Sequence, residues 1–593
     1  MTTQYATRLD ALRQQMTRMG VDAYLIPISG PFLGEYAGPS DARLEWLTGF
    51  TGSNGAALVL KDHALICSDS RYTLQLQDQV DEKIWTTADM HKPGVIGWLD
   101  TQGIRSIKIG YDSSLHAAFE IDKMEKALEP FQIALHPIRD NLVDLIWTSR
   151  PPVPHTGVEP FLDVYAGETA LQKIDRIAQG LKDKGHAAAF LSDPSDLAWL
   201  LNVRGRDVPH TPVALSCGVI YADKHIEWVI DPLRVPLELK KNLNHLLQVT
   251  PPESIDDTMM RIKAKVGAGS VLVDRAYFTA RHAQMFEFRN IAICPGVSPI
   301  AQPRAIKSHA EQSWTREAHK KDAVALIRFL SWLDAHISSG DLDELSVAEE
   351  LSRFRELDPA FRGNSFGTIA AFGPHGALPH YRAVPETNAR LLGDTLLLVD
   401  SGGQYVGGTT DITRTVAVGT PTDDMCRHYT TVLQAHIAVA MATFPVQTRG
   451  AHLDSLARNV MWRHGIDFAH RLGHGIGCFM GVHEPAVTLS QLGTDMIEKG
   501  MYISNEPAYY RAGEYGIRLE NDVIVAESDI PGFLKLDTVS LVPFDPVLTK
   551  LSLMTADEKE WLAGYHTHIL EVIGPLLPQS DREWLEAVVD YFC

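Results

Sequence analysis

The sequence predicts a multidomain α/β protein in which two similar α/β domains precede a strand-rich third domain. The chain has 593 residues, too many for one hydrophobic core, so several domains are expected. A helix followed by a buried strand occurs twice in the first half, and short alternating strands begin near residue 364. The predicted domains span residues 1–150, 156–303 and 308–545, with a helical extension over 546–593.

The first half of the chain repeats one pattern. Apolar residues recur at helical spacing over residues 5–19, Gly20 follows, and the run VDAYLIPI predicts a buried strand. The same order returns with a helical stripe over 168–184, then Gly185 and the run AAAFL. A Ser-Asp pair and then a Trp-Leu pair follow both copies. This repetition predicts two related α/β domains in tandem.

Proline-rich segments separate the predicted domains. The first is SRPPVPHTG at 149–157, and the second is CPGVSPIAQPR at 294–304. Both lack apolar periodicity, which is typical of linkers. Further helices are predicted from Glu311, over 344–356, after a capping box of Thr555 and Glu558, and near 581–592.

Composition narrows the class of protein. The chain carries 54 Lys and Arg against 74 Asp and Glu, a net charge of −20, which argues against nucleic acid or an anionic membrane as the main partner. It has no apolar run of roughly 18 residues and no apolar N-terminal segment, so neither a membrane span nor a signal peptide is expected. Six scattered cysteines predict free thiols in a reducing, cytoplasmic compartment.

Five metal-ligand candidates lie between residues 396 and 525. Carboxylates and imidazole suit Mn, Co, Fe or Zn better than Cu. Four carboxylates in one pocket would raise one another's pKa, and two divalent cations would balance their four charges. The pattern therefore predicts a two-metal site. Its candidate ligands are Asp400 in LLLVDSGG, Asp411 in TTDITRTVAV, His474 in GHGIG, Glu506 in NEPAYY and Glu520 in GIRLEND.

Strand alternation supports their convergence. In GIRLENDVIV, alternation places Arg518, Glu520 and Asp522 on one face, so Arg518 and Glu520 are expected to reach the same space. Taken singly, an Asp at a strand end is usually a turn residue, and an Arg-x-Glu pair is usually a solvated ion pair. All five candidates occur within one span of the chain, and this combination favours a metal site over the single-residue interpretations.

These motifs resemble the Xaa-Pro aminopeptidases (aminopeptidase P). The resemblance rests on DSGGQY, TTDITRT, GHGIG, VHE, EPAYY and GIRLEN, covers essentially the whole chain, and is closest to the long, three-domain form. It implies two creatinase-like N-terminal domains followed by a pita-bread catalytic domain. It also implies two Mn²⁺ ions, with Co²⁺ or Zn²⁺ as alternatives, and a homodimer.

The resemblance also assigns roles near the metals. It implies catalytic and substrate-binding roles for His380, His470 and His483, none of which would bind metal. A tyrosine, Tyr509 or its neighbour Tyr510, is expected to receive the proline ring with His380 and His470. Of the two, Tyr509 is predicted to bind the substrate.

The predicted reaction is release of the first residue from peptides with proline in second position. A water shared by two cations would become a hydroxide that attacks the first carbonyl. By resemblance, Glu506 is both a ligand and the general base, His483 stabilises the oxyanion, and Arg518 lies close to the metals. The leaving nitrogen belongs to proline, which has no N–H.

Three other readings compete with this one. A prolidase would cleave only dipeptides, and the two N-terminal domains favour the aminopeptidase by resemblance. A non-enzymatic pita-bread binding protein or a creatinase-like metal-free hydrolase would lack metal ligands, whereas all five candidates are present here.

Some positions depart from the family pattern. Pro485 and Ala486 follow Glu484 where the family commonly has Gly-Pro, and Ala508 stands where glycine is frequent. None of these changes removes a ligand. They leave the shape of the substrate pocket, and hence its preference, open.

Overall fold

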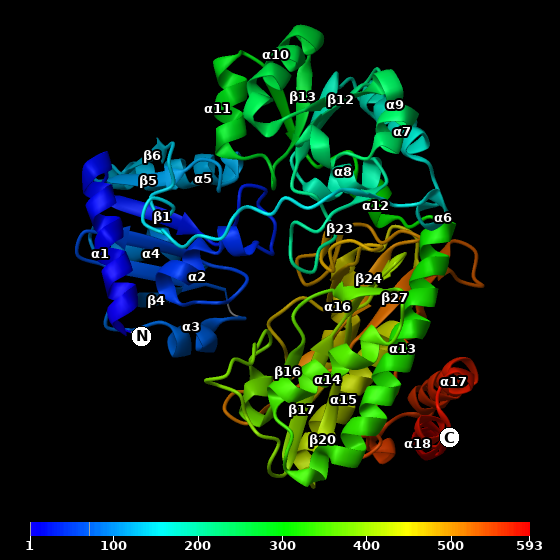
Figure 1. Cartoon of the computed structure of the whole chain (residues 1–593). Coiled ribbons are helices and arrows are strands. Elements are labelled where there is room, and N and C mark those ends of the chain that lie inside the picture. Colours follow the sequence, from blue (N-terminus) through cyan, green and yellow to red (C-terminus); the bar gives the residue numbers. More distant parts are fainter. Residues whose placement is uncertain (1, 70) are drawn as a thin grey trace. The chain divides into compact units, whose positions relative to one another are not determined.

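The computed structural model describes residues 2–69 and 71–593, which divide into two compact units (Figure 1). Unit 1 comprises Met1–Leu162 and Glu168–Ala301, and unit 2 comprises Asp163–Gly167 and Gln302–Cys593. The first two predicted domains thus form one compact unit, and the C-terminal helical extension belongs to the second.

Unit 1 contains two six-stranded sheets with the same strand order. One sheet is ordered β4-β3-β2-β1-β5-β6, and the other β12-β11-β10-β8-β13-β14. Equivalent neighbours pair in the same direction: β1 with β2 and β8 with β10 are antiparallel, whereas β1 with β5 and β8 with β13 are parallel. The sequence repeat therefore corresponds to two copies of one fold. The strands are β1 (Ala23–Pro27), β2 (Ala56–Leu60), β3 (Ala64–Ser68), β4 (Thr86–Asp89), β5 (Lys108–Asp112), β6 (Ala134–Ile138), β8 (Ala188–Leu191), β10 (Cys217–Tyr221), β11 (Ile226–Val229), β12 (Leu247–Thr250), β13 (Ser270–Asp274) and β14 (Ala292–Gly296).

The two copies meet through reciprocal hydrogen bonds. Helix α5 (Ala118–Leu128) follows β5, and α11 (Ala280–Phe288) follows β13 at the equivalent position. The Ala118 amide donates to the Phe278 carbonyl at 2.8 Å, and the Ala280 amide donates to the His116 carbonyl at 2.9 Å. Each copy thus donates one backbone hydrogen bond to the equivalent part of the other.

Helices α1 (Thr2–Met19) and α7 (Ala170–Asp183) occupy equivalent places before β1 and β8. Both predicted helices are confirmed, and both bury apolar stripes. The stripe of α7 buries Ile174, Ile177 and Leu181, whereas Leu171 in its first turn is 41% exposed. The segment 294–304 is not simply a linker, since it holds the end of β14 and most of α12 (Ala301–Ala305).

Unit 2 is built from short strands in several sheets. A six-stranded sheet is ordered β21-β28-β27-β24-β22-β23, and smaller sheets are ordered β16-β17-β20, β15-β18-β19 and β25-β26. This is the strand-rich core that the sequence predicts. The strands are β15 (Phe361–Asn364), β16 (Ile369–Phe372), β17 (Thr395–Ser401), β18 (Gly403–Tyr405), β19 (Gly408–Thr409), β20 (Ile412–Val418), β21 (Thr443–Pro445), β22 (Gly473–Gly475), β23 (Glu484–Leu489), β24 (Tyr502–Asn505), β25 (Ala508–Arg511), β26 (Tyr515–Arg518), β27 (Asn521–Glu527) and β28 (Phe533–Thr538).

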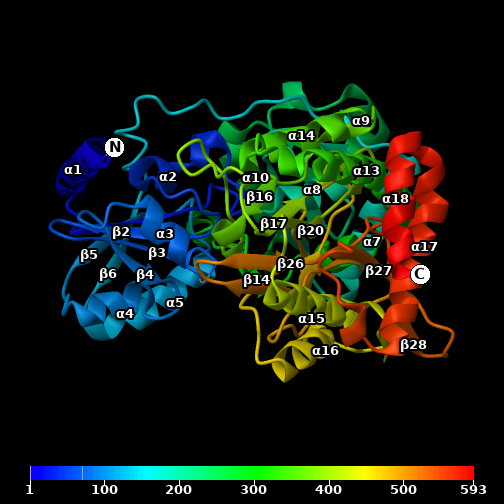
Figure 2. The ribbon, with the colours of Figure 1, turned by 90° about the horizontal axis from the view of Figure 1, so that it is seen from below.

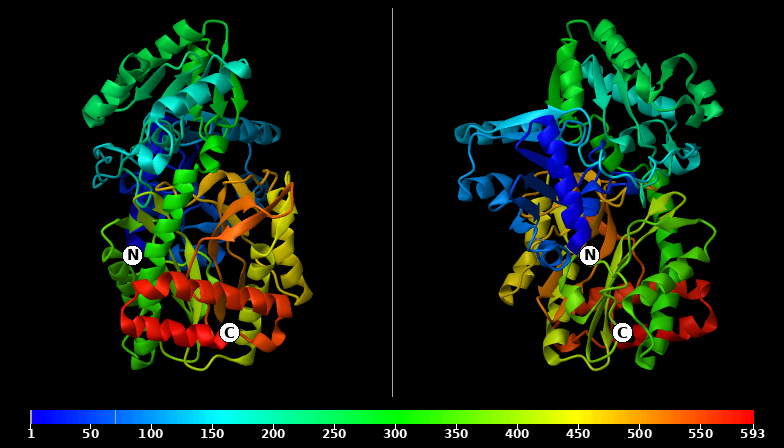
Figure 3. Two further views of the ribbon diagram at one scale, coloured as in Figure 1. Left: turned by 90° about the vertical axis from the view of Figure 1, so that its right-hand side faces the viewer. Right: turned by 60° about the vertical axis from the view of Figure 1, so that its left-hand side comes forward.

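Helices of unit 2 pack around these sheets. The long helix α13 (His309–His336) begins at a capping box of Ser308 and Glu311 and is followed by α14 (Glu344–Glu356). Helices α15 (Asp423–Ala440) and α16 (Gly450–Arg463) lie side by side (Figure 2). So do α17 (Ala556–Ile573) and α18 (Gln579–Phe592) (Figure 3). None of the described helices is long and apolar enough to cross a membrane.

Two segments predicted as single strands are each broken in two. TTDITRTVAV forms β19 and β20, and GIRLENDVIV forms β26 and β27, which belong to different sheets. Alternation alone does not reveal such breaks, because the apolar pattern continues across them. Each break carries a predicted metal ligand.

Candidate metal centre

The ligand candidates lie in strands or at breaks between strands. Asp400 is in β17 and His474 in β22, whereas Asp411 lies between β19 and β20. Glu506 follows β24 directly, and Glu520 lies between β26 and β27. At such a break, the backbone no longer follows the alternation of a strand. The side chain of the residue there can therefore turn toward a space that it shares with residues of other strands.

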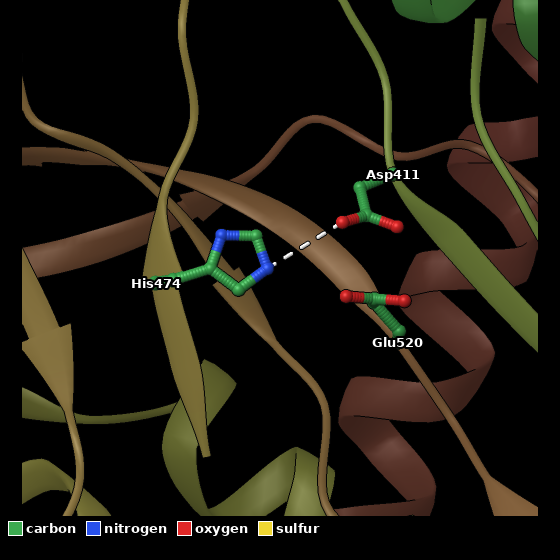
Figure 4. Close-up of side chains that lie close together, drawn as sticks. All are labelled: Asp411, His474 and Glu520. Atoms are coloured by element: carbon green, nitrogen blue, oxygen red, sulfur yellow. Dashed lines mark ion pairs between the residues drawn. The ribbon is translucent and has the colours of Figure 1, made fainter. Parts of the chain in front are cut away.

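Three of the candidates converge closely. One ligand atom each of Asp411, His474 and Glu520 lies within 4.8 Å of the other two, and all three residues are buried. Figure 4 shows their side chains pointing toward one another. His474 Nε2 lies 3.5 Å from Asp411 Oδ2 and 3.6 Å from Glu506 Oε1, which brings Glu506 into the same group.

Asp400 joins the group through Arg518. Arg518 Nη2 donates to Asp400 Oδ2 at 2.5 Å, and its Nε donates to Thr413 Oγ1 at 3.3 Å. The Thr413 hydroxyl in turn donates to Glu520 Oε2 at 2.7 Å. Arg518 and Glu520 therefore reach the same space, as alternation predicts, despite the break between their strands.

The ring of His474 is oriented for ligation. Its Nδ1 donates to the Gly475 carbonyl at 3.0 Å, so the Nε2 lone pair faces the carboxylates. The flanking glycine is required, since a Cβ on Gly473 would lie 2.0 Å from the Ser504 carbonyl oxygen. The GHG motif thus allows β22 to approach β24 closely.

The carboxyl groups cannot all ionise unaided. Burial raises the pKa of the Asp411 carboxyl well above its ordinary value, and the charge of Asp400 raises it further. Burial, followed by the charge of Glu520, does the same to the pKa of Glu506. Burial and the charge of Asp411 raise the pKa of Glu520. A compensating positive charge is needed to hold them ionised.

The donor set fits divalent cations. Asp400 Oδ1 is buried and makes no hydrogen bond within the described part of the chain. Burial of an oxygen acceptor without a hydrogen-bond donor costs free energy, and coordination of a cation would compensate for this cost. Carboxylate oxygens with one imidazole nitrogen are the ligands that Mn²⁺, Co²⁺ and Zn²⁺ accept.

Asp522 supports the candidate ligand Asp411 through a hydrogen bond, a role that the sequence did not reveal. Its Oδ2 accepts from the Asp411 amide at 3.0 Å and from the Tyr502 hydroxyl at 2.7 Å, and lies 3.2 Å from His319 Nε2. Alternation placed Asp522 on the metal face. Nothing in the sequence pattern singled out His319 or Tyr502.

The three predicted histidines occupy different positions. His470 Nε2 lies 2.9 Å from the Tyr510 hydroxyl, and its Nδ1 is 3.8 Å from Glu506 Oε2. The exposed His483 ring lies edge to face with His474, with 4.3 Å between ring centroids. His380 is half-buried in the turn after η7 (Gly373–Ala377), and its role at the centre stays a prediction.

The structure favours Tyr510 over Tyr509 as the tyrosine of the site. Tyr510 accepts from Arg518 Nη1 at 2.6 Å and contacts His470. Tyr509 packs on His428 of α15, with 4.6 Å between ring centroids. Neighbours on a strand point to opposite faces, so only one of the two tyrosines faces the carboxylates.

Family comparisons agree with this architecture. Residues 313–527 match the Metallopeptidase family M24, and residues 532–590 match the C-terminal region of peptidase M24. Residues 8–142 and 149–311 each match a Creatinase/Prolidase N-terminal domain.

Relatives match over nearly the full length. A probable Xaa-Pro aminopeptidase P of Laccaria bicolor is 36% identical over 98% of this chain and 93% of the relative. Xaa-Pro aminopeptidase 2 of Homo sapiens is 34% identical over 98% of this chain and 87% of the relative. The chain belongs to the Xaa-Pro aminopeptidase family.

Solved structures support the same conclusion. The X-prolyl aminopeptidase from Caenorhabditis elegans, described as a cytosolic enzyme with a di-nuclear active site, has a TM-score of 0.93 and 29% identity over 99% of both chains. The Xaa-Pro dipeptidase from Bacillus anthracis shares the fold over 63% of this chain, with a TM-score of 0.52 and 24% identity. The predicted fold class is confirmed: two creatinase-type N-terminal domains precede a pita-bread domain. This aminopeptidase family member is a metal-dependent hydrolase.

Proposed function

We propose that this enzyme removes the first residue from peptides that carry proline in second position. The observation that carries the proposal is the convergence of Asp411, His474 and Glu520 in one buried group, to which contacts link the carboxylates of Glu506 and Asp400. The names of its relatives and the di-nuclear centre of the Caenorhabditis elegans enzyme support it.

Two divalent cations would be held by the five candidate ligands. When bound, they would supply an activated water and polarise the scissile carbonyl. Manganese is the expected metal, and cobalt or zinc suits the same donors. The proposed ligands are Asp400, Asp411, His474, Glu506 and Glu520.

Residues of the chain would then handle protons and charge. Glu506 is only partly buried, so it can accept a proton from the attacking water and pass it to the leaving nitrogen. His483, exposed beside His474, is placed to donate to the developing oxyanion. Arg518 orients Asp400 through a charge-assisted hydrogen bond.

The proline side of the substrate would meet His470 and Tyr510. A proline amide has no N–H, so recognition depends on contact with its ring. His470 and Tyr510 hold each other through a hydrogen bond and present flat surfaces beside Glu506. His380 is proposed to complete this pocket.

Substrate length distinguishes the aminopeptidase from a prolidase. We expect a tripeptide Xaa-Pro-Xaa to release its free first residue and a Pro-Xaa dipeptide, as resolved by chromatography. Cleavage restricted to Xaa-Pro dipeptides would instead assign the chain a prolidase activity.

A homodimer and a cytoplasmic location are also proposed. Trp462 of α16 is 53% exposed, a large apolar side chain that a second copy would cover. Light scattering should show a dimer that Trp462→Glu weakens. The six cysteines are free, as is typical of a reducing compartment.

A further inference from the structure

A buried ion cluster lies directly behind the exposed His483. The Lys307 ammonium donates to Glu484 Oε1 and, at 2.9 Å, to the Arg304 carbonyl. Arg304 Nε lies 3.4 Å from Glu484 Oε2. All three side chains are buried. Arg304 lies in α12 and Lys307 in the segment that joins α12 to α13, both far from Glu484 in the sequence.

Such a cluster is a poor way to gain stability. Taking charges out of water costs free energy that ion pairing often fails to recover, and apolar residues of similar volume would pack as well. Buried ion pairs are better suited to holding a segment of the chain in one conformation. The position of Glu484, next to His483, indicates which segment is held.

The backbone of Glu484 lies against the strand that carries His474. Glu484 pairs with Gly475, whereas Thr488 pairs with His474, so β23 has extra residues between these two pairs. A Cβ on Gly475 would lie 2.7 Å from the Glu484 carbonyl oxygen. Within the bulge, Ala486 has a φ of 83°, a strained value for a residue other than glycine.

His483 directly precedes Glu484 in the sequence. Its side chain is exposed, and its ring centroid lies 4.3 Å from that of His474. The next residue, Glu484, is fixed on both sides: its carboxylate by Lys307 and Arg304, and its backbone by Gly475.

We propose that Glu484, held by Lys307 and Arg304, is a positioning residue that aims His483 at the reacting carbonyl. The proposal rests on the oxyanion-stabilising role of His483 in the proposed function. Displacement of a catalytic group by about 1 Å can lower the rate on the order of 100-fold. Loss of the cluster would thus lower kcat by displacing His483, while the side chains of the proposed metal ligands would stay in place.

A double-mutant cycle on an Xaa-Pro-Xaa peptide tests this proposal. The variants are Glu484→Gln, His483→Ala and the pair together, in the full metal-loaded chain. We expect Glu484→Gln to lower kcat on the order of 10- to 100-fold, with KM within about threefold and metal content unchanged. In the His483→Ala background, the same change should alter kcat by less than about threefold.

Further variants separate positioning from folding. Lys307→Arg should retain most of the activity because it keeps a cation beside Glu484. If Glu484→Gln does not fold, Lys307→Met replaces it in the same cycle, since Arg304 still faces the carboxylate. The matched control is Glu227→Gln in unit 1, which removes a buried carboxylate that pairs with Arg261 and should leave kcat unchanged.

The outcomes are distinct. Additive losses from Glu484→Gln and His483→Ala, or a wild-type kcat in Glu484→Gln, would overturn the positioning role. Loss of bound metal in parallel with kcat would overturn it as well. A wild-type chain that cleaves no Xaa-Pro peptide would instead refute the proposed function.

Discussion

The guanidinium of Arg414 donates to the backbone carbonyl of Glu520 at 2.6 Å. The same group donates to the Thr413 carbonyl at 2.8 Å and to the Tyr565 hydroxyl at 3.2 Å. Tyr565 lies on α17, so this C-terminal helix is tied to the strands on either side of the ligand candidates Asp411 and Glu520. Arg414 is buried among neutral oxygen acceptors, which include the carbonyls of Pro543 and Val542.

Replacing Arg414 should destabilise unit 2. Arg414→Met removes the hydrogen bonds that its guanidinium donates to several buried carbonyls, and we expect it to lower the free energy of unfolding by roughly 3 kcal/mol or more. Tyr565→Phe removes one hydroxyl and should cost about 1 kcal/mol. Urea unfolding of both variants checks the order. Equal effects would show that the hydroxyl, rather than the guanidinium, organises this network.

Asp522→Asn should weaken metal binding without removing a proposed ligand. Asp522 accepts from the Asp411 amide, and an asparagine can present an NH₂ there instead of an oxygen. Loss of such support typically lowers metal affinity about 10- to 100-fold. Calorimetric titration with Mn²⁺ measures the change. Asp529→Asn, at an exposed position, is the control, and an unchanged affinity in Asp522→Asn would exclude the supporting role.

His474 and His483 should fail in different ways. His474→Ala removes a proposed ligand, so we expect loss of bound metal together with activity. His483→Ala should keep its metal but lose about 10²- to 10³-fold in kcat, because one oxyanion donor is gone. Metal analysis beside steady-state kinetics distinguishes the two. Loss of metal in both variants would place His483 among the ligands.

Tyr510→Phe and Tyr509→Phe form a matched pair on one strand. Tyr510 contacts Arg518 and His470, whereas Tyr509 packs on His428. We expect Tyr510→Phe to lower kcat/KM on the order of tenfold, since a hydrogen bond to a charged group is lost. Tyr509→Phe should stay near wild type. The reverse order would restore Tyr509 as the substrate-binding tyrosine.

Metal should stabilise the protein more as pH rises. The folded-state pKa values of Asp411, Glu506 and Glu520 are raised by burial and mutual repulsion. Without metal, the folded chain holds protons that the unfolded chain releases near pH 4, so this contribution to stability is lost as pH climbs from about 4 to the raised values.

Cations replace those protons when they bind. The difference in melting temperature between metal-loaded and chelated protein should therefore be larger at about pH 8 than at about pH 5.5. Scanning fluorimetry at both values measures it. A difference that shrinks with rising pH would mean that these carboxyl groups are not the ones that metal neutralises.

The candidate ligands were found from local signals in the sequence. Asp400 follows an apolar run, Asp411 follows a Gly-Gly pair and two threonines, and His474 stands between glycines. Alternation correctly linked Arg518 to Glu520 through one shared space. These features depend on residues adjacent in the sequence. The sheets of unit 1 were likewise visible as a repeated order of helix, glycine and strand.

The remainder depends on contacts between distant residues. The sequence pattern does not distinguish Tyr509 from Tyr510. The pairing of β25 with β26 determines which of the two side chains faces the carboxylates. His319 and Lys307 reach Asp522 and Glu484 across long stretches of chain, and no periodicity marks them. The breaks at Asp411 and Glu520 are invisible to alternation because the apolar pattern runs through them.

Metal titration into the chelated chain tests the two-metal mechanism most directly. Activity on an Xaa-Pro-Xaa peptide should vanish on chelation and return as Mn²⁺ is added, with saturation at two equivalents bound per chain. Full activity in the chelated protein, or saturation at a single equivalent, would contradict it.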